Sequence, residues 1–323
     1  MSGLLGAFRR RILTPNMADT KIDVRGFYKK DENAREVLEN IGRYFVTGYA
    51  YAAEAGAARD AEAPLEEIPV RFRGFAYEGA AMCLAIRDGM PIGHSHHVED
   101  FLAGRGDQHV YMAYVGVGWA MARLPRMCWS RLHAPDPLLR WLVLDGYGFH
   151  QAYFHTRRYV HEQYRTTGFS WPAEGPSWYA DRVIDQGIGR AMWFVGGTDV
   201  QRVAALLDAY APERRADMYS GAGLAATYAG GAAEDELLWF WEHAGRYQAQ
   251  VAQGSAFAAG ARVRAGLVVP HNEIATKIFC GLTTQQASDI TDLVLPDRAA
   301  DGDLPGYELW RQRIAHELPS VRG

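Results

Sequence analysis

The chain has 323 residues, of which 48% are hydrophobic, so it can bury a substantial core, and whole-chain disorder or a small disulfide-held fold is excluded. The 34 basic and 38 acidic residues give a formal net charge of −4 without a long run of one sign, so we expect no nucleic-acid partner. Three widely spaced cysteines, Cys83, Cys128 and Cys280, form no C-x-x-C pair and fit a reducing cytoplasm.

Residues 1–25 are predicted to be a lead-in to one helical domain over residues 26–323. The first 13 residues, MSGLLGAFRRRIL, have an apolar stretch too short for an export signal. They fit a docking or disordered lead-in better than an amphipathic contact with a membrane surface, which stays open as an alternative. No window approaches the roughly 18 apolar residues of a spanning helix. We therefore expect a cytoplasmic protein without a transmembrane segment.

A short motif, in most copies a polar residue followed by Gly-x-Gly or Gly-x-Ala, recurs in helix-like segments along the chain. Its copies read EGAAMCLA, VGVGWAMA, DGYGFHQA, QGIGRAMW, SGAGLAAT and QGSAFAAG. Their first glycines are Gly79, Gly116, Gly146, Gly187, Gly221 and Gly254. The resulting spacings of 37, 30, 41, 34 and 33 residues are typical of a solenoid of αα-hairpins.

The first three of these glycines and the last three are offset by 108, 105 and 108 residues, which indicates an internal duplication. The expected fold is therefore all-α, a solenoid or toroid-like array of αα-hairpin repeats in two pseudo-symmetric halves of three repeats each. We expect the first half at about residues 26–165, the second at about 166–290 and a C-terminal helix at about 303–317.

Glycine in a helix interior costs about 1 kcal/mol relative to alanine, so its recurrence at one point of each helix indicates close helix crossings. The position four residues after the first glycine shares its face and is small in five copies. These are Cys83, Ala120, Ala191, Ala225 and Ala258. The sixth copy has His150, which inside such a packing seam requires a hydrogen-bond partner or a gap that faces a ligand.

Two further motif positions are predicted to line a groove for a long, mostly apolar ligand. The residue before the first glycine is polar in five copies of six: Glu78, Val115, Asp145, Gln186, Ser220 and Gln253. Four residues later the side chains are mostly large and apolar: Met82, Trp119, Phe149, Arg190, Leu224 and Phe257. An equally open alternative is that the polar residues are exposed to solvent or cap helix ends.

An acid beside a base in a repeat seam can be kept dry and have a shifted pKa, which favours acid–base chemistry, although structural ion pairs share this pattern. The catalytic candidates are Asp185, Arg190, Asp145, His150 and Glu78. The candidate substrate-binding residues are Tyr77, His109, Trp119, Phe149, Gln186, Trp193, Ser220 and Gln253.

Other motifs give weaker indications. The string GAGLAA at residues 221–226 matches a dinucleotide fingerprint but follows no predicted strand. His94, His96 and His97 lie in a segment with Gly and Pro, where histidines are usually solvated, so no metal site is predicted. The acidic signatures of isoprenoid cyclases are absent from the sequence. No cofactor is predicted, and whether a partner supplies flavin or metal stays open.

Six segments carry a resemblance to a known family: REVLENIGRYFVTGY, VRFRGFAYEGAAM, DPLLRWLVLDGYGFHQAYFH, DQGIGRAMWFVGG, PERRADMYSGAGLAATYAGG and AQGSAFAAGAR. Across about residues 26–314 the chain resembles the DUF1702 family, also called UnbL-type enediyne biosynthesis proteins. The resemblance implies secondary metabolism beside a polyketide synthase that makes a linear polyene. It also implies UnbV-like and UnbU-like pathway proteins as companions, and it supplies no catalytic residues.

We therefore expect a natural-product biosynthesis protein, more an enzyme than not, that holds a long apolar polyene-type intermediate and converts or cyclises it. One alternative is a non-catalytic helical-repeat scaffold or carrier for partner pathway proteins. Another is a terpene or polyene cyclase without the usual acidic metal motifs. A closed, dry polar cluster favours catalysis, whereas an open concave face with exposed aromatic side chains favours binding.

Overall fold

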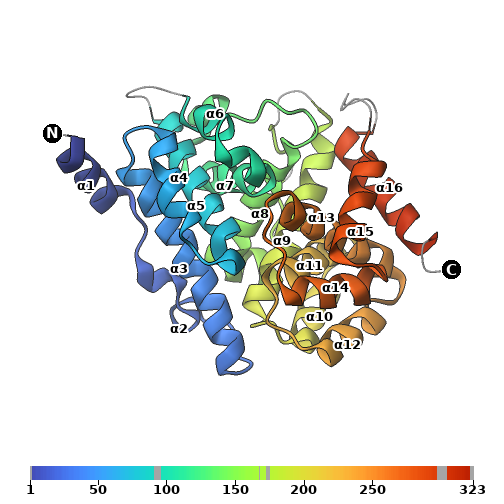
Figure 1. The fold of residues 1–323 in the computed structure, drawn as a ribbon. Coiled ribbons are helices and arrows are strands. Elements are labelled where there is room, and N and C mark those ends of the chain that lie inside the picture. The colour runs from blue at the N-terminus through green and yellow to red at the C-terminus, as the bar shows by residue number, and fades with distance from the viewer. Residues whose placement is uncertain (1, 91–95, 167, 172–174, 297–303, 321–323) are drawn as a thin grey trace.

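The computed structural model describes residues 2–90, 96–166, 168–171, 175–296 and 304–320. Within these ranges the chain forms helices and no strand, which confirms the predicted all-α class (Figure 1). None of the helices in these ranges has both the length and the apolar character needed to cross a membrane.

Long helices form an inner layer in which each helix packs against the next along the chain. They are α3 (Glu32–Glu54), α5 (Val70–Gly89), α7 (Val110–Arg123), α8 (Trp141–Phe154), α9 (Ser177–Val195), α11 (Pro212–Ala229) and α13 (Gln248–Arg264). The series curls back on itself, because α11 contacts α3 and Tyr228 on α11 packs edge-on against Phe75 on α5. The inner helices therefore form a ring.

Shorter elements cover the outside of this ring (Figure 1). In the second half of the chain they are the regular helices α10 (Val200–Asp208), α12 (Glu234–Ala244) and α14 (Pro270–Cys280), followed by α15 (Thr284–Leu293). Among the described residues of the first half they are α4 (Glu62–Glu66), α6 (His97–Leu102) and short helical turns at Ala58–Ala61, Arg105–His109, Arg126–Arg131 and Arg157–His161. Helix pairs are thus regular in the second half and shortened in the first.

Terminal helices flank the ring on opposite sides (Figure 1). At the N-terminal side, α1 (Ser2–Leu13) packs on α3, and Arg9 donates hydrogen bonds to backbone carbonyls at the end of that helix. The short helix α2 (Ile22–Arg25) follows. At the other side, α16 (Gly306–Ser320) packs on α13 and α15. The basic part of α1 is therefore docked on the protein.

The recurring glycines lie where inner helices cross, as the sequence predicted. A methyl group on Gly116 would overlap the carbonyl oxygen of Glu78, and one on Gly187 would overlap that of Asp145. The first glycines of three further copies, at positions 146, 221 and 254, meet the preceding motif helix in the same way. The second glycines, at positions 118, 148, 189 and 223, meet the following one. Backbone thus packs directly on backbone on both sides of most motif helices.

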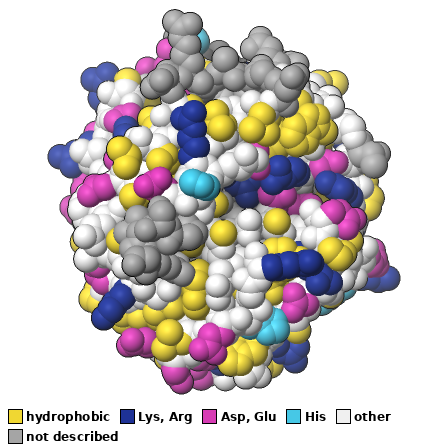
Figure 2. Space-filling model, turned by 90° about the vertical axis from the view of Figure 1, so that its right-hand side faces the viewer, with side chains coloured by type: hydrophobic (Ala, Val, Ile, Leu, Met, Phe, Trp, Pro, Cys, Tyr) yellow, Lys and Arg dark blue, Asp and Glu magenta, His cyan; other side chains and the backbone are white. Residues whose placement is uncertain are grey.

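The surface around α16 carries mixed charge. On the face shown in Figure 2, Lys and Arg side chains are interspersed with Asp and Glu side chains, and hydrophobic side chains lie between them. No region of one sign dominates the part of this face that is described.

Candidate functional site

An apolar cavity lies inside the ring and consists of two chambers. The empty space between the lining residues, part of which is open to solvent, is about 960 Å³ in the main chamber and about 510 Å³ in the second chamber. Four residues line both chambers and form the neck between them: Met112, Arg190, Leu224 and Tyr228. The C-terminal ends of α7 and α8 line the main chamber and their N-terminal ends line the second. The two chambers therefore follow one another along these helices.

The motif position three residues after each first glycine faces this cavity in all six copies. Met82, Trp119, Phe149, Arg190 and Leu224 line the main chamber, and Phe257 lines the second. The strip that the sequence placed along a groove is thus part of the wall of a cavity inside the ring. The curled arrangement of the helices brings these side chains around a common space.

The residues before the first glycines are all buried, with exposed fractions of 3% or less. They also lie inside helices, so the alternative that they are exposed or cap helix ends is wrong. Buried polar groups need partners, and these side chains form two clusters. One cluster lies at the neck and the other lies under α16.

The neck cluster consists of Glu78, Arg190 and Asp145. The Nη1 atom of Arg190 lies 2.7 Å from Oδ1 of Asp145, and the guanidinium lies 5.0 Å from the centre of the Phe149 ring. Gln186 donates a 2.8 Å hydrogen bond to the other Asp145 oxygen. Glu78 lines the main chamber together with Arg190. An acid and an ion pair thus lie near one another at the neck of a mostly apolar chamber.

Burial raises the pKa of Glu78 to about 8, an effect that Arg190 opposes and Asp145 reinforces. The Glu78 carboxyl is therefore mostly protonated at neutral pH. Burial also raises the pKa of Asp145, against the opposing effects of Arg190 and Gln186. A neutral, buried acid near a fixed cation is suited to proton transfer.

This raised pKa predicts that Glu78 makes the protein less stable as pH rises. The folded pKa of about 8 exceeds the unfolded value of about 4.3, so between these values the folded chain binds more protons. The contribution is lost at up to about 1.4 kcal/mol per pH unit as pH rises through this window. In urea unfolding between about pH 5 and 8, Glu78→Gln should therefore gain stability over the wild type with increasing pH. Parallel pH profiles of the two proteins would refute the raised pKa.

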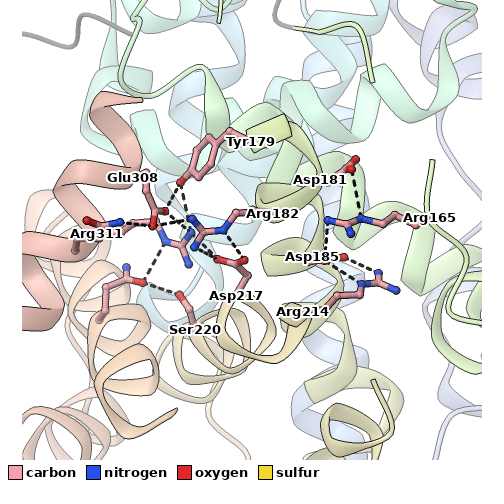
Figure 3. Close-up of polar contacts among 12 residues, drawn as sticks. Arg165, Tyr179, Asp181, Arg182, Asp185, Arg214, Asp217, Ser220, Glu308 and Arg311 are labelled. Atoms are coloured by element: carbon pink, nitrogen blue, oxygen red, sulfur yellow. Dashed lines mark hydrogen bonds and ion pairs between the residues drawn. The ribbon is translucent and has the colours of Figure 1, made fainter. Parts of the chain in front are cut away.

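The second cluster fixes α16 to α9 and α11 (Figure 3). Arg182 donates to both oxygens of Asp217, at 2.9 and 3.0 Å, and to Glu308 at 2.9 Å. Arg311 pairs with Asp217 at 2.9 Å and with Glu308 at 3.1 Å. Tyr179 donates to Glu308 at 2.8 Å. None of these five residues lines a chamber, so the cluster joins helices and does not contribute to the wall of the cavity.

Asp185 and Arg190, predicted as an acid beside a base, do not pair with each other. Asp185 binds Arg214 through two contacts of 2.6 and 3.0 Å (Figure 3). Residues five apart on a helix point about 140° away from each other, so Asp185 and Arg190 face different neighbours. Arg190 instead reaches Asp145 on the adjacent helix.

Asp145 and His150 are also five residues apart and are not paired. His150 is buried against Trp119 and Phe154, and neither of its ring nitrogens has a hydrogen-bond partner among the residues described. Burial lowers its pKa to about 3. His150 does not line either chamber, so the gap beside it that the sequence suggested is not part of the cavity.

The predicted substrate-binding residues divide between the cavity and the core. Trp119 and Phe149 line the main chamber. Tyr77, His109 and Trp193 do not; Tyr77 donates to Glu66 at 2.6 Å and stacks on His109, while Trp193 donates to the Gly230 carbonyl at 2.9 Å.

Three polar candidates lie behind the neck. Gln186 donates to Asp145 and to Tyr307 of α16, the latter at 3.2 Å. Ser220 donates to Gln253 at 2.7 Å, and Gln253 accepts from Arg311 at 3.3 Å. Their polar atoms thus connect inner helices to α16 and do not face the main chamber.

Comparison with known proteins gives one family. A sequence profile of the proteins of unknown function DUF1702 matches residues 4–318. The chain belongs to the DUF1702 family. No curated protein and no solved structure matches it. The resemblance seen in the sequence is therefore confirmed at the level of the family, over nearly the whole chain.

The histidine-rich segment of this DUF1702 chain is only partly described, because His94 lies outside the described residues. His96 contacts Glu99 at 2.8 Å, and His97 contacts Asp88 at 2.7 Å. Over the described ranges, no three His, Cys, Asp or Glu side chains come together in a way that could hold a metal ion.

Sequence reasoning missed Tyr228, whose buried hydroxyl in the neck has no hydrogen-bond partner in the described ranges. It also missed Arg123, Tyr153 and Phe194, which line the main chamber. All four lie seven residues after a first glycine, two helical turns along the same face. Extending the cavity strip by four residues, about one further turn, would have found them.

Proposed function

We propose that this protein binds a long, mostly apolar polyene-type molecule in the cavity and converts it by proton transfer, as an isomerisation or cyclisation. The observation that carries the proposal is that the buried Glu78 carboxyl and Arg190 line the same chamber, whose walls include aromatic side chains, and burial raises the pKa of Glu78 to about 8. A buried polar cluster also favours a catalyst over a scaffold that binds through an open aromatic face.

The proposed reaction begins with the acid. Glu78 gives its proton to one carbon of the polyene, and the π electrons of that double bond form the new C–H bond. The remaining cation is delocalised along the chain, and the faces of Trp119 and Phe149 stabilise it through cation–π attraction. Arg190 stabilises the Glu78 carboxylate that forms.

The reaction ends when the carboxylate removes a proton from a neighbouring carbon. In an isomerisation, the C–H electrons then form a double bond at a shifted position. In a cyclisation, a ring forms first, and the same electrons then form a double bond in the cyclic product. Glu78 is protonated again, and neither an oxidant nor a reductant is consumed. The buried chamber keeps water from adding to the cation.

Deuterium incorporation tests this function. The protein is expressed beside a polyene-producing polyketide synthase, and the purified protein is then incubated in D₂O with the extracted polyene. The wild type should give an isomer that carries carbon-bound deuterium by mass spectrometry. Glu78→Gln should lower incorporation at least about 100-fold while still binding polyene, because general acid catalysis contributes about 10²–10⁴-fold.

Glu66→Gln is the matched control, since Glu66 pairs with Arg73 and Tyr77 outside both chambers. It should retain wild-type incorporation. A polyene that the wild type leaves unchanged and unlabelled would contradict the proposed conversion. Copurification of pathway proteins with such an inactive chain, independent of Glu78, would favour the scaffold instead.

A further inference from the structure

A basic cleft adjoins the main chamber at its outer end. The cleft has a volume of about 990 Å³ and shares Tyr153 and Phe154 with the main chamber, so the two spaces lie on either side of the same aromatic side chains. Arg25, Arg157 and Arg158 line the cleft, and Arg123 lines the adjacent part of the chamber.

The balance of charge at this place is positive although the chain as a whole is negative. Four arginines, Arg25, Arg123, Arg157 and Arg158, stand against two carboxylates, Asp19 and Glu162, an excess of two positive charges. Glu162 is already paired with Arg157 at 2.8 Å. The net charge of the whole chain is −4. We refer to these four arginines as the basic rim.

Two rim guanidiniums contact aromatic rings, and neither pairs with a carboxylate among the residues described. Arg25 lies over the Phe154 ring at 4.9 Å, and its buried Nε has no hydrogen-bond partner in the described part of the chain. Arg158 lies 3.7 Å from the centre of the Tyr164 ring. Ring contacts position a guanidinium and leave its N–H groups able to bind an anion.

Two of the rim arginines act on the same buried side chain. Besides burial, Arg123 and Arg25 are among the groups that lower the pKa of His150. They belong to α7 and α2, so two separate elements bring guanidinium groups to the same place.

We propose that the basic rim binds an anionic end group, a carboxylate or a phosphate, of the apolar ligand whose chain fills the main chamber. This inference rests on the proposed function and adds the ligand's polarity and orientation. Gly116, which packs on Glu78, and Arg123 at the rim are seven residues apart on α7, about 10 Å along the helix. The bound ligand therefore presents to Glu78 a carbon about 10 Å from its anionic end.

Retinoids test this, because one conjugated chain is available with three end groups. Binding of retinoic acid, retinyl phosphate and retinol is measured by quenching of tryptophan fluorescence, since Trp119 lines the chamber. At least one anionic probe should bind the wild type at least about tenfold more tightly than retinol, and 0.5 M salt should reduce this preference. Preference for retinoic acid assigns a carboxylate, and preference for retinyl phosphate assigns a phosphate.

Variants then locate the effect. Arg25→Gln with Arg158→Gln should bring the ratio of affinities close to one without changing the affinity for retinol. Arg158→Gln alone should reduce this affinity ratio in part. The single variant keeps the test valid if the double variant misfolds, and circular dichroism shows whether either variant is folded. Arg202→Gln is the matched control, since Arg202 stacks at 4.2 Å on Tyr28 away from the cavity, and it should keep the full preference.

The two proposals fail in different ways. If retinol binds as tightly as both anionic probes, or if the preference persists in the double variant, the basic rim does not recognise the ligand and only this inference is overturned. If none of the probes binds, the apolar-ligand function is itself overturned, and the inference with it.

Discussion

Gly187→Ala is expected to lower the free energy of unfolding by about 3 kcal/mol, because overpacking against a rigid neighbour is costly. The added methyl would overlap the backbone carbonyl oxygen of Asp145 on α8, which no rotamer change can move. Relief requires α8 and α9 to separate. Because Gly189 on the same helix packs on the Met218 carbonyl of α11, such a shift disturbs both crossings.

Gly260→Ala is the matched control for this prediction. Gly260 also lies within an inner helix, but its nearest neighbours are the side-chain oxygens of Thr291, at 3.2 Å, and Ser288, at 4.0 Å. The gain in helix propensity of about 1 kcal/mol offsets a small adjustment there, so stability should change by less than about 1 kcal/mol. Urea unfolding followed by circular dichroism measures both. If the two substitutions lowered stability equally, contact with the neighbouring backbone would not be the reason that Gly187 must be glycine.

These crossings were predictable because glycine inside a helix has few explanations. The same helical period that places Gly116 and Gly187 in crossings places the residue three positions later in the cavity. Local periodicity therefore identified Trp119, Phe149 and Arg190 as one surface before any helix was placed in space.

The partners of those residues were not predictable, because they depend on which helices become neighbours. Asp145 and Arg190 meet across α8 and α9, whereas proximity in the sequence pointed to Asp185. The role of α16 was also hidden, since Glu308 and Arg311 lie outside the repeat and carry no periodic signal. The sequence predicted a solenoid or toroid-like array without deciding between the two, and it is the ring that brings the strip residues around one cavity.

Arg190→Met is expected to lower the free energy of unfolding by about 3–5 kcal/mol at pH 7, because it leaves a buried carboxylate without its cation. Asp145 is fully buried, and Arg190 and Gln186 are the partners that its carboxylate oxygens have in the described chain. The double variant with Asp145→Asn should be more stable than Arg190→Met alone, since asparagine carries no charge and can still accept from Gln186. Double-mutant urea unfolding measures the recovery.

The stability lost in Arg190→Met should also become smaller as pH falls. Burial already raises the pKa of Asp145 above its usual value, and removal of Arg190 raises it further. Protonation relieves the unpaired charge, so the deficit of Arg190→Met should shrink as pH falls from 7 toward 4, and the double variant should not show this change. The exposed Arg10–Glu54 pair is the control, where Arg10→Met should cost less than about 1 kcal/mol at any of these pH values. A deficit in Arg190→Met that stays constant with pH would mean that the lost stability comes from packing at the neck and not from the Asp145 charge.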